Sequence, residues 1–297
     1  MPLFHSEGPR AARLRRIGLI VCLAAVVQSA FSSLPAEAQA QNPRALLQKV
    51  SAAYQRLNTY DGTASVEISA FFKEKMLQTR AMRVEMKMKR PNKLRLDFTM
   101  PTGTQTILSD GTNLFIYLAS TNQYARYPTA PTIDAMLFPL LAVRAGVQAS
   151  LDPLYFLGKK QLPAALTDLR FQGSNTYNGK PVFVVTGVTT RPRTVLRDKK
   201  GHQVVLPPSK QYWTWWINKQ TSLLEKIEQR VPDLKMTVPA RQGKKVTAQQ
   251  IPVTQRMRHV VLTATANPSL ADSVFTFTPP PGAVEVRTVK DILQSGR

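Results

Sequence analysis

MRVEMKMKRPNKLRLDF, residues 82–98, is the stretch that decides the fold class. Apolar and charged side chains alternate with a period of two through residues 82–89 and again through 93–98. Between these runs, RPNK at 90–93 favours a turn. Two alternating runs around a turn indicate an antiparallel hairpin with one apolar and one solvated face. The apolar face comprises Met82, Val84, Met86, Met88, Leu94, Leu96 and Phe98.

The strand pattern continues on both sides of this hairpin. A period of two begins at Asp61, and residues 110–111 (Asp-Gly) and 178–179 (Asn-Gly) predict further hairpin turns. A helix is expected before the strands, capped by Asn42. Its apolar face comprises Leu46, Leu47, Val50, Tyr54 and Leu57. The sequence therefore predicts a mainly β chain of the α+β class, built as a long antiparallel meander.

One apolar segment interrupts the meander at APTIDAMLFPLLAVRAG, residues 130–146. Thr132 can cap a helix there, and Pro139 should kink or split it. A second short apolar piece, LDPLYFLGKK, follows at 151–160. Such a helix must lie on the apolar face of the sheet, either as a fixed part of the core or as a lid over a cavity.

All three tryptophans fall in YWTWWIN, residues 212–218. On a strand, Trp213 and Trp215 share one face and Trp216 lies on the other. No basic residue lies between positions 212 and 217, which disfavours a base-stacking platform. We therefore expect Trp213 and Trp215 to face the interior, either as solid core or as the lining of a ligand cavity. Flexible methionines at 82, 86 and 88 favour the cavity.

The N-terminus has the parts of a secretory signal. Four arginines lie between residues 10 and 16, an apolar run follows at 17–31, and Ala-x-Ala patterns occur at 36–40. We expect cleavage after Ala40, which makes residues 1–40 a signal peptide and 41–297 a single periplasmic domain. The apolar run is short for a membrane span of about 20 residues. Val21 before Cys22 does not match a lipoprotein signal.

The mature chain is strongly basic. The leader carries four arginines and two glutamates, so the net charge falls from +22 to about +20 on cleavage. Since an exported protein rarely meets nucleic acid, the expected anionic partners are lipid headgroups, lipopolysaccharide or acidic polymers. The alternative is a solvated surface with no specific partner.

Two basic stretches, 191–210 and 232–252, are predicted as loops inserted into the β scaffold because they are rich in proline or glycine. They are candidate contacts with an anionic membrane surface or a membrane protein. The basic residues proposed for this contact are Arg191, Arg193, Arg197, Lys199, Lys200, Arg241, Lys244 and Lys245.

Catalytic and metal motifs are not found in the sequence. The single cysteine leaves with the leader, and the histidines that remain are His202 and His259, so neither a metal site nor a cofactor is expected. Glu67, Glu85 and Asp97 lie on strands where carboxylates can approach each other. Their basic neighbours predict a solvated ion-pair face instead, and no catalytic residue is proposed.

Three elements, in this order, resemble the LolA-like superfamily of periplasmic lipoprotein carriers. They are the K-R-P-N turn in MKRPNKLRLDF, the S-D-G hairpin in ILSDGTNLFIYLASTNQYARYP, and the terminal SVFTFTPPPGAVEV. APTIDAML, YNGKPVFVV and WTWWINKQTSLLEKIE are similar to an uncharacterised branch of predicted periplasmic proteins. The resemblance covers roughly residues 43–290.

The resemblance implies an incomplete antiparallel β-barrel whose concave apolar face is covered by helices acting as a lid. Such carriers shield acyl chains, which cost about 0.8 kcal/mol per exposed CH₂. In the carriers, an arginine of the R-P-N turn latches the lid through hydrogen bonds, and the matching residue here is Arg90. The longer chain, its basic insertions and Pro139 depart from the carriers, which favours lipid binding in general over lipoprotein cargo.

We therefore expect an exported, soluble, non-enzymatic binding protein for an acylated or otherwise apolar ligand. The alternation does not decide whether Phe115 or Ile116 faces inward. The proposed ligand-binding residues are Met82, Met86, Met88, Leu96, Phe98, Phe115, Tyr117, Leu137, Phe138, Trp213 and Trp215. The alternative is a periplasmic sensor or accessory module with a packed interior. An enzyme would need a carboxylate pair in a cleft.

Overall fold

The computed structural model describes residues 41–136, 152–158, 161–191, 194–197, 203–206, 208–242 and 245–288. Contacts divide the chain into two compact units, Met1–Gln41 and Asn42–Arg297. The fold described below is that of the second unit, and the predicted signal peptide lies outside the described residues. Within the described part of the chain, no helix is both long and apolar enough to cross a membrane.

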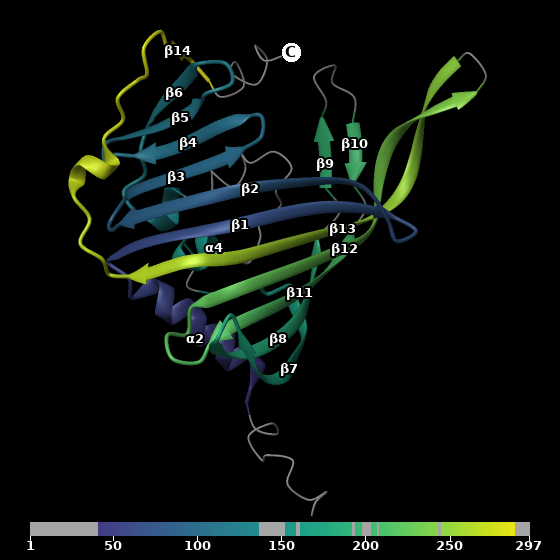
Figure 1. The fold of residues 1–297 in the computed structure, drawn as a ribbon, viewed down its shortest axis with the longest axis horizontal. Coiled ribbons are helices and arrows are strands. Elements are labelled where there is room, and N and C mark those ends of the chain that lie inside the picture. Colours follow the sequence, from purple (N-terminus) through teal and green to yellow (C-terminus); the bar gives the residue numbers. More distant parts are fainter. Residues whose placement is uncertain are drawn as a thin grey trace, which may run out of the picture. The chain divides into compact units, whose positions relative to one another are not determined.

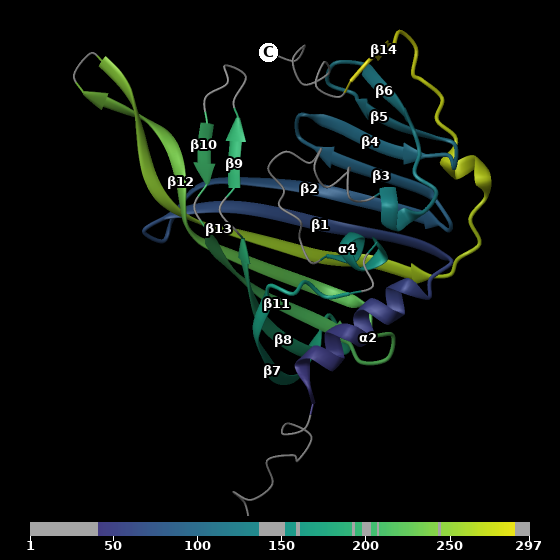
Figure 2. The same ribbon diagram turned by 180° about the vertical axis from the view of Figure 1, so that it is seen from behind.

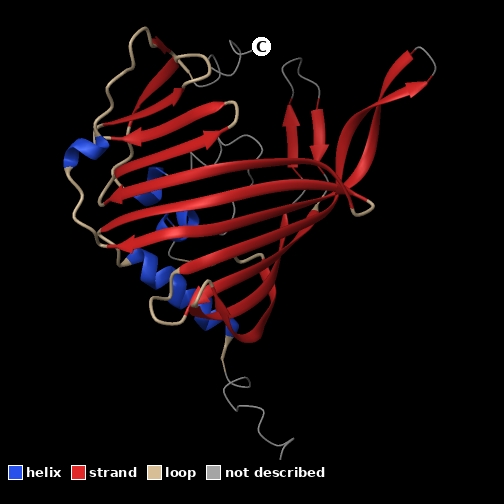
Figure 3. Cartoon of the chain, viewed as in Figure 1, coloured by secondary structure: helices blue, strands red, loops and turns tan. Residues whose placement is uncertain are grey.

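One 12-stranded sheet forms most of the described structure (Figures 1 and 3), in the order β14-β6-β5-β4-β3-β2-β1-β13-β12-β11-β8-β7. Its strands are β1 (Thr59–Phe72), β2 (Lys75–Lys89), β3 (Lys93–Met100), β4 (Gly103–Ser109), β5 (Asn113–Leu118), β6 (Gln123–Pro128), β7 (Leu166–Tyr177), β8 (Lys180–Arg191), β11 (Ser209–Asn218), β12 (Leu224–Gln242), β13 (Lys245–Ala266) and β14 (Val284–Val286). Neighbouring strands are antiparallel except for the parallel pair of β14 with β6. The sheet is open, which confirms the predicted antiparallel meander and the incomplete barrel.

The predicted turns connect these strands. Residues 90–92 separate β2 from β3, and residues 110–112 separate β4 from β5. Asn178 and Gly179 join β7 to β8 with φ angles of 48° and 75°, the left-handed conformation that a two-residue hairpin requires. Far apart in the sequence, β1 pairs with β13 and joins the two halves of the sheet.

The alternation between residues 82 and 98 divides the sheet into two faces. In the register of β2 and β3, apolar residues lie opposite apolar residues and charged residues opposite charged residues. The inner face here contains Met86, Met88, Leu94 and Leu96, all buried. The outer face contains Glu85, Lys87, Arg95 and Asp97.

Two helices pack on the inner face, as Figure 2 shows. Helix α2 (Pro43–Gln55) is capped by Asn42, whose Oδ1 accepts hydrogen bonds from the backbone N–H groups of Arg44 and Ala45. Helix α4 (Pro153–Gly158) is short, and Asp152 Oδ1 accepts from the backbone N–H of Tyr155 in its first turn at 3.1 Å. The predicted helix after Asn42 is therefore confirmed, with its apolar face in the core.

The helix predicted for 130–146 is described as far as residue 136. Residues 133–136 form its first turn, and Thr132 Oγ1 accepts a hydrogen bond from the N–H of Ala135 at 3.2 Å. Ile133 and Met136 are buried in the same core as α2 and α4. The predicted cap is confirmed, whereas Leu137, Phe138 and Pro139 lie outside the described residues.

The two basic stretches predicted as loops contain strands. β12 and β13 continue through 232–252 as a paired ribbon, and a two-stranded sheet of β9 (Thr194–Arg197) and β10 (Gln203–Leu206) occupies part of 191–210. The loop prediction was wrong because proline was taken as a breaker. In the ribbon each strand has one neighbour, so a missing proline N–H is tolerated at the unpaired edge.

The proposed anionic-surface residues fall in these stretches. Arg191, Arg197, Arg241 and Lys245 lie on strands β8, β9, β12 and β13. Arg193, Lys199, Lys200 and Lys244 lie outside the described residues.

Candidate functional site

Arg90 connects the edge of the sheet to the helical segments on the inner face. Its Nε donates to the carbonyl of Leu57, just after α2, at 2.9 Å, and its Nη2 donates to the carbonyl of Leu157 in α4 at 3.1 Å. Its Nη1 lies 3.6 Å from Asp134 Oδ1, in the helical turn 133–136. One guanidinium group, whose five N–H donors form a planar fork, therefore touches all three segments.

The last turn of α4 receives a second set of donors. Gln55 Nε2 donates to the carbonyls of Phe156 and Leu157 at 2.7 and 3.0 Å. These carbonyls have no partner within so short a helix, and the positive charge of Arg90 is favourable at a helix C-terminus. One neutral and one charged side chain therefore bind the last turn of α4, in addition to the burial of its apolar residues in the core.

The rest of the R-P-N turn joins the other recognised motifs. The Pro91 carbonyl accepts from the N–H of Ile133 at 2.8 Å. Asn92 Nδ2 donates to the carbonyls of Gly111 and Ala130 at 2.9 and 3.1 Å, and Ser109 Oγ donates to the Asn92 carbonyl at 2.7 Å. The R-P-N turn, the S-D-G hairpin and the start of APTIDAML thus meet at one place.

Trp213 and Trp215 face the inner side of β11, as predicted. Their relative exposures are 2% and 0%, and the two rings stack with centroids 5.9 Å apart. Trp216 lies on the outer face, where Lys226 Nζ sits 4.2 Å from its ring centroid. In this structure the two inner tryptophans belong to the core that contains α2 and α4.

The aromatic residues of α2 and α4 complete this core. Tyr54 stacks on Phe156 with ring centroids 6.1 Å apart, and its hydroxyl accepts from the N–H of Leu224 at 3.3 Å. Burial raises the pKa of Tyr54 and of Tyr60 well above the ordinary tyrosine value. Both hydroxyls therefore stay protonated and neutral at physiological pH.

Most of the described residues proposed for ligand binding share the inner face. Met86, Met88, Leu96 and Phe98 are buried in the core with both tryptophans, and Met82 packs against it while partly exposed. Phe115 and Tyr117 do not join them. The strand alternates so that Leu114 and Ile116 point inward. The prediction for Phe115 and Tyr117 was wrong in its choice of face.

Phe115 and Tyr117 instead belong to a small outer cluster beneath the C-terminal segment. Phe277 stacks on Phe115 with centroids 4.7 Å apart and lies 6.2 Å from Tyr117 and 5.3 Å from Tyr124. Strand 113–118 is therefore packed on both faces, by the core on the inner face and by Phe277 on the outer face. The pattern of residues within the strand does not show which face is the inner one. The signal was the terminal FTFT sequence, which supplies the covering ring.

A polar group on the inner face was missed from the sequence. Trp213 Nε1 donates to Thr189 Oγ1 at 2.9 Å, and Gln229 Nε2 donates to Gln211 Oε1 at 3.1 Å. Gln211 and Gln229 are 6% and 5% exposed. Their sequence positions carry a weak signal, because Gln211 is two residues before Trp213 and so shares its face.

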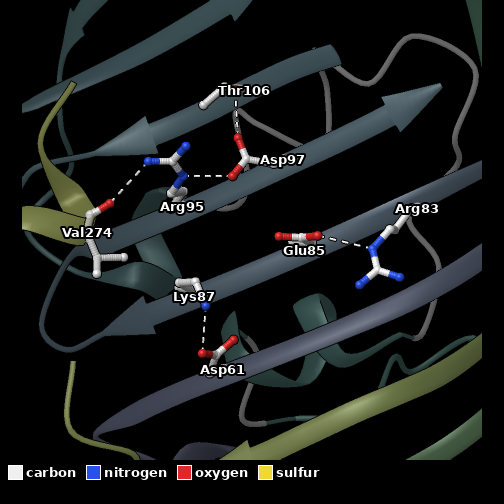
Figure 4. A network of polar contacts seen from close by, with 8 residues as sticks. All are labelled: Asp61, Arg83, Glu85, Lys87, Arg95, Asp97, Thr106 and Val274. Carbon is white, nitrogen blue, oxygen red and sulfur yellow. Dashed lines mark hydrogen bonds and ion pairs between the residues drawn. The ribbon is translucent and has the colours of Figure 1, made fainter. Parts of the chain in front are cut away.

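Two of the three carboxylates considered for catalysis, Glu85 and Asp97, lie in ion pairs on the outer face (Figure 4). Glu85 pairs with Arg83 at 3.1 Å, and Asp97 pairs with Arg95 at 2.7 Å while accepting from Thr106 Oγ1 at 2.6 Å. Glu67 accepts from Ser69 Oγ at 3.1 Å. The expected ion-pair face is confirmed for Glu85 and Asp97. Among the described residues, no group of three or more metal-binding side chains occurs.

Solved structures similar to this chain share little sequence with it. An uncharacterized conserved protein from Thermus thermophilus is 12% identical with a TM-score of 0.38, over 84% of this chain and 100% of that one. The Mycobacterium tuberculosis lipoprotein LppX is 12% identical with a TM-score of 0.37, over 77% and 97%. The LolA superfamily protein NE2245 from Nitrosomonas europaea is 11% identical with a TM-score of 0.31, over 80% and 99%.

Among curated proteins, none matches the chain significantly. The family model described as predicted periplasmic protein (DUF2092) matches residues 44–289. The resemblance of the motifs to an uncharacterised periplasmic branch is thereby confirmed, and the chain belongs to this family of predicted periplasmic proteins.

Proposed function

We propose that this periplasmic chain is a non-enzymatic carrier or binding protein that shields an acylated or lipid-like ligand between the inner face of the sheet and its helices. The observation that supports this proposal most is the set of contacts made by Arg90. A single side chain ties the end of α2, the end of α4 and the turn 133–136 to the edge of the sheet.

These three helical segments form a cover over the inner face, and because one side chain holds them, they can be released together. Arg90 is 23% exposed, so water can compete for its hydrogen bonds when the helices move. Each bond is exchanged for a bond to water, which makes the net cost of opening far smaller than the strength of the bonds themselves. Apolar surface uncovered by the movement would then be covered by an acyl chain.

The ligand would contact the inner face at residues that are buried without it. Met82, at the border of the core, offers partly exposed thioether surface that adapts to different chain shapes. The inner-face residues proposed as contacts are Met82, Met86, Met88, Leu96, Phe98, Trp213 and Trp215, with Leu137 and Phe138 from the segment beyond residue 136. The hydrogen-bonded pair Gln211 and Gln229 lies beside them and suits the polar end of such a ligand.

Native mass spectrometry of the mature chain purified from a bacterial periplasm tests this proposal, with lipid extraction of the same sample. A stoichiometric lipid is expected, and Trp213→Ala should lower the retained fraction. Trp216→Ala is the matched control, because it removes the same ring from the outer face of the same strand. A bare mass that stays unchanged after incubation with lipids and acylated peptides would exclude the carrier.

The second candidate is a non-catalytic sensor or accessory module with a packed interior. The observation that favours it is the complete burial of Trp215 and the 2% exposure of Trp213. This candidate predicts cooperative unfolding that lipids do not change. The proposed basic contacts on 191–210 and 232–252 would then bind a protein partner instead of an anionic membrane surface.

A further inference from the structure

A groove of about 440 Å³ opens on the outer face of the sheet, away from the helices. Its lining comes from β1, β13, β12 and β11, which are adjacent in this order. Three arginines and two glutamates line it, so its charged groups sum to about +1. The pairing register arranges these side chains in two parallel rows of very different charge.

The first row is balanced once Lys226, which pairs with Glu228, is counted with it. It runs across the strands from Glu67 to Arg258, Glu228 and Thr214. Acid and base alternate, and Glu228 lies 3.6 Å from Arg258 and 2.7 Å from Lys226. Opposite charges on neighbouring strands attract, so this row satisfies its own charges.

The second row, two residues further along each strand, is not balanced. It runs from Ser69 to Arg256, Arg230 and Tyr212. Arg230 and Arg256 are directly opposite each other in the register, a separation of about 5 Å between Cβ atoms. Like charges in this position repel, and both neighbours in the row are neutral hydroxyl residues.

Aromatic rings hold both guanidinium groups in the groove. Arg230 lies over the ring of Tyr212 at 5.0 Å, and Arg256 over the ring of Phe71 at 4.5 Å. Arg256 also pairs with Glu74 at 2.7 Å, but that carboxylate is 81% exposed and therefore strongly screened by water. Ordering the arginines in advance lowers the entropy that a ligand must lose to bind them.

We propose that the row Ser69–Arg256–Arg230–Tyr212 binds a phosphate group between its two arginines. Guanidinium groups match phosphate oxygens in pairs, and the bonds are charge-assisted on both sides. Tyr212 is 37% exposed and lines the same groove, and its hydroxyl can donate a further hydrogen bond. An anion between Arg230 and Arg256 reduces the repulsion between them, which the exposed Glu74 offsets only on the side of Arg256.

The phosphate can belong to a soluble ester or to a lipid headgroup, and two probes separate these sources. Calorimetric titration with glycerol 3-phosphate at low salt tests the ester, and flotation with phosphatidylglycerol vesicles tests the headgroup, with phosphatidylcholine vesicles as reference. Glycerol 3-phosphate has no acyl chain, so its binding is independent of any ligand on the inner face.

Arg230→Gln and Arg256→Gln should each weaken binding by about tenfold, as expected for the loss of a charge-assisted pair. Arg258→Gln is the matched control, because it removes the same charge from the balanced row and should change affinity less than about twofold. Since all three side chains lie on the outer face of paired strands, circular dichroism should show the same fold in each variant.

Either probe supports the site if binding depends on Arg230 and Arg256 but not on Arg258. Binding of vesicles alone assigns the phosphate to a lipid headgroup. Equal losses in all three variants would mean diffuse attraction to a basic surface and would overturn the proposal, as would the failure of both probes to bind.

Discussion

Two aromatic clusters lie on opposite faces of the same sheet and are covered in different ways. On the inner face, Trp213 and Trp215 stack 5.9 Å apart within the core that holds α2 and α4. On the outer face, Phe277 stacks on Phe115 at 4.7 Å. The inner cover is formed by helices that precede and follow strands β1–β6 in the sequence, α2 before β1 and α4 after β6. The outer cover is the segment that follows β13.

The covers also differ in how they are attached. Arg90 ties the inner cover through hydrogen bonds to carbonyls and a contact with Asp134, and it is 23% exposed. Asp272 ties the outer cover through exposed ion pairs to Lys89 and Lys93 at 2.7 and 3.0 Å. Exposed ion pairs contribute little, so these ties add less to the attachment of the outer cover than its rings and the pairing of β14 with β6. The inner face is thus the main core, and one side chain joins its helical segments to the sheet.

The largest effect should follow from emptying the inner cluster. Trp215→Ala removes a fully buried ring and should lower the free energy of unfolding by about 3–5 kcal/mol. Urea denaturation followed by circular dichroism measures this loss. A loss no greater than that of Trp216→Ala would mean that the inner face collapses into the space left by the Trp215 ring and is not the dominant core.

Cutting the inner tie should have the next largest effect. Arg90→Leu removes the donor to the Leu57 carbonyl, one of the two donors to the Leu157 carbonyl and the ion pair with Asp134, and should cost about 2 kcal/mol. Hydrogen exchange should then rise in α4 and the turn 133–136, with little change in β2 and β3. Arg90→Lys keeps the positive charge but loses the planar fork of N–H donors, so it should restore only part of the stability that Arg90→Leu loses. Unchanged exchange in α4 would show that Gln55 alone positions it.

Removing the outer ring should have a smaller effect that stays on its own face. Phe277→Ala takes away a partly exposed ring that contacts Phe115, Tyr117 and Tyr124, and should cost about 1–2 kcal/mol. Tryptophan emission and ligand retention should not change, since no tryptophan lies in this cluster. A shift in emission would show that the two faces are coupled through the sheet.

The smallest effect concerns the acid dependence of the outer tie. Hydrogen bonds from Lys89 and Lys93 lower the pKa of Asp272 below its ordinary value. Because the folded pKa is the lower one, this contribution is present above the unfolded pKa of about 3.9 and is lost as pH falls through the folded value. Asp272→Asn should remove the dependence. Melting temperatures between pH 2 and 7 measure it, and identical profiles for both chains would contradict the assignment.

The sequence by itself determined the local elements. Residues 82–98 carry an alternation whose register the structure reproduces, with Met86 opposite Leu96 and Glu85 opposite Asp97. The caps at Asn42 and Thr132, the turns, and the inward direction of Trp213 and Trp215 were also predictable. These features depend on interactions between residues within a few positions of one another, so a short stretch of sequence is enough to predict them.

Tertiary structure decided everything that needs two distant segments. Phe115 lies on the outer face because Phe277, more than 150 residues later, covers it there. The ribbon in 232–252 is a strand pair because each half finds its register partner, not because its proline content favours strands. Arg230 and Arg256 look like ordinary surface arginines along the chain. Only the pairing of β12 with β13 sets them opposite each other, because cross-strand distance depends on register and not on composition.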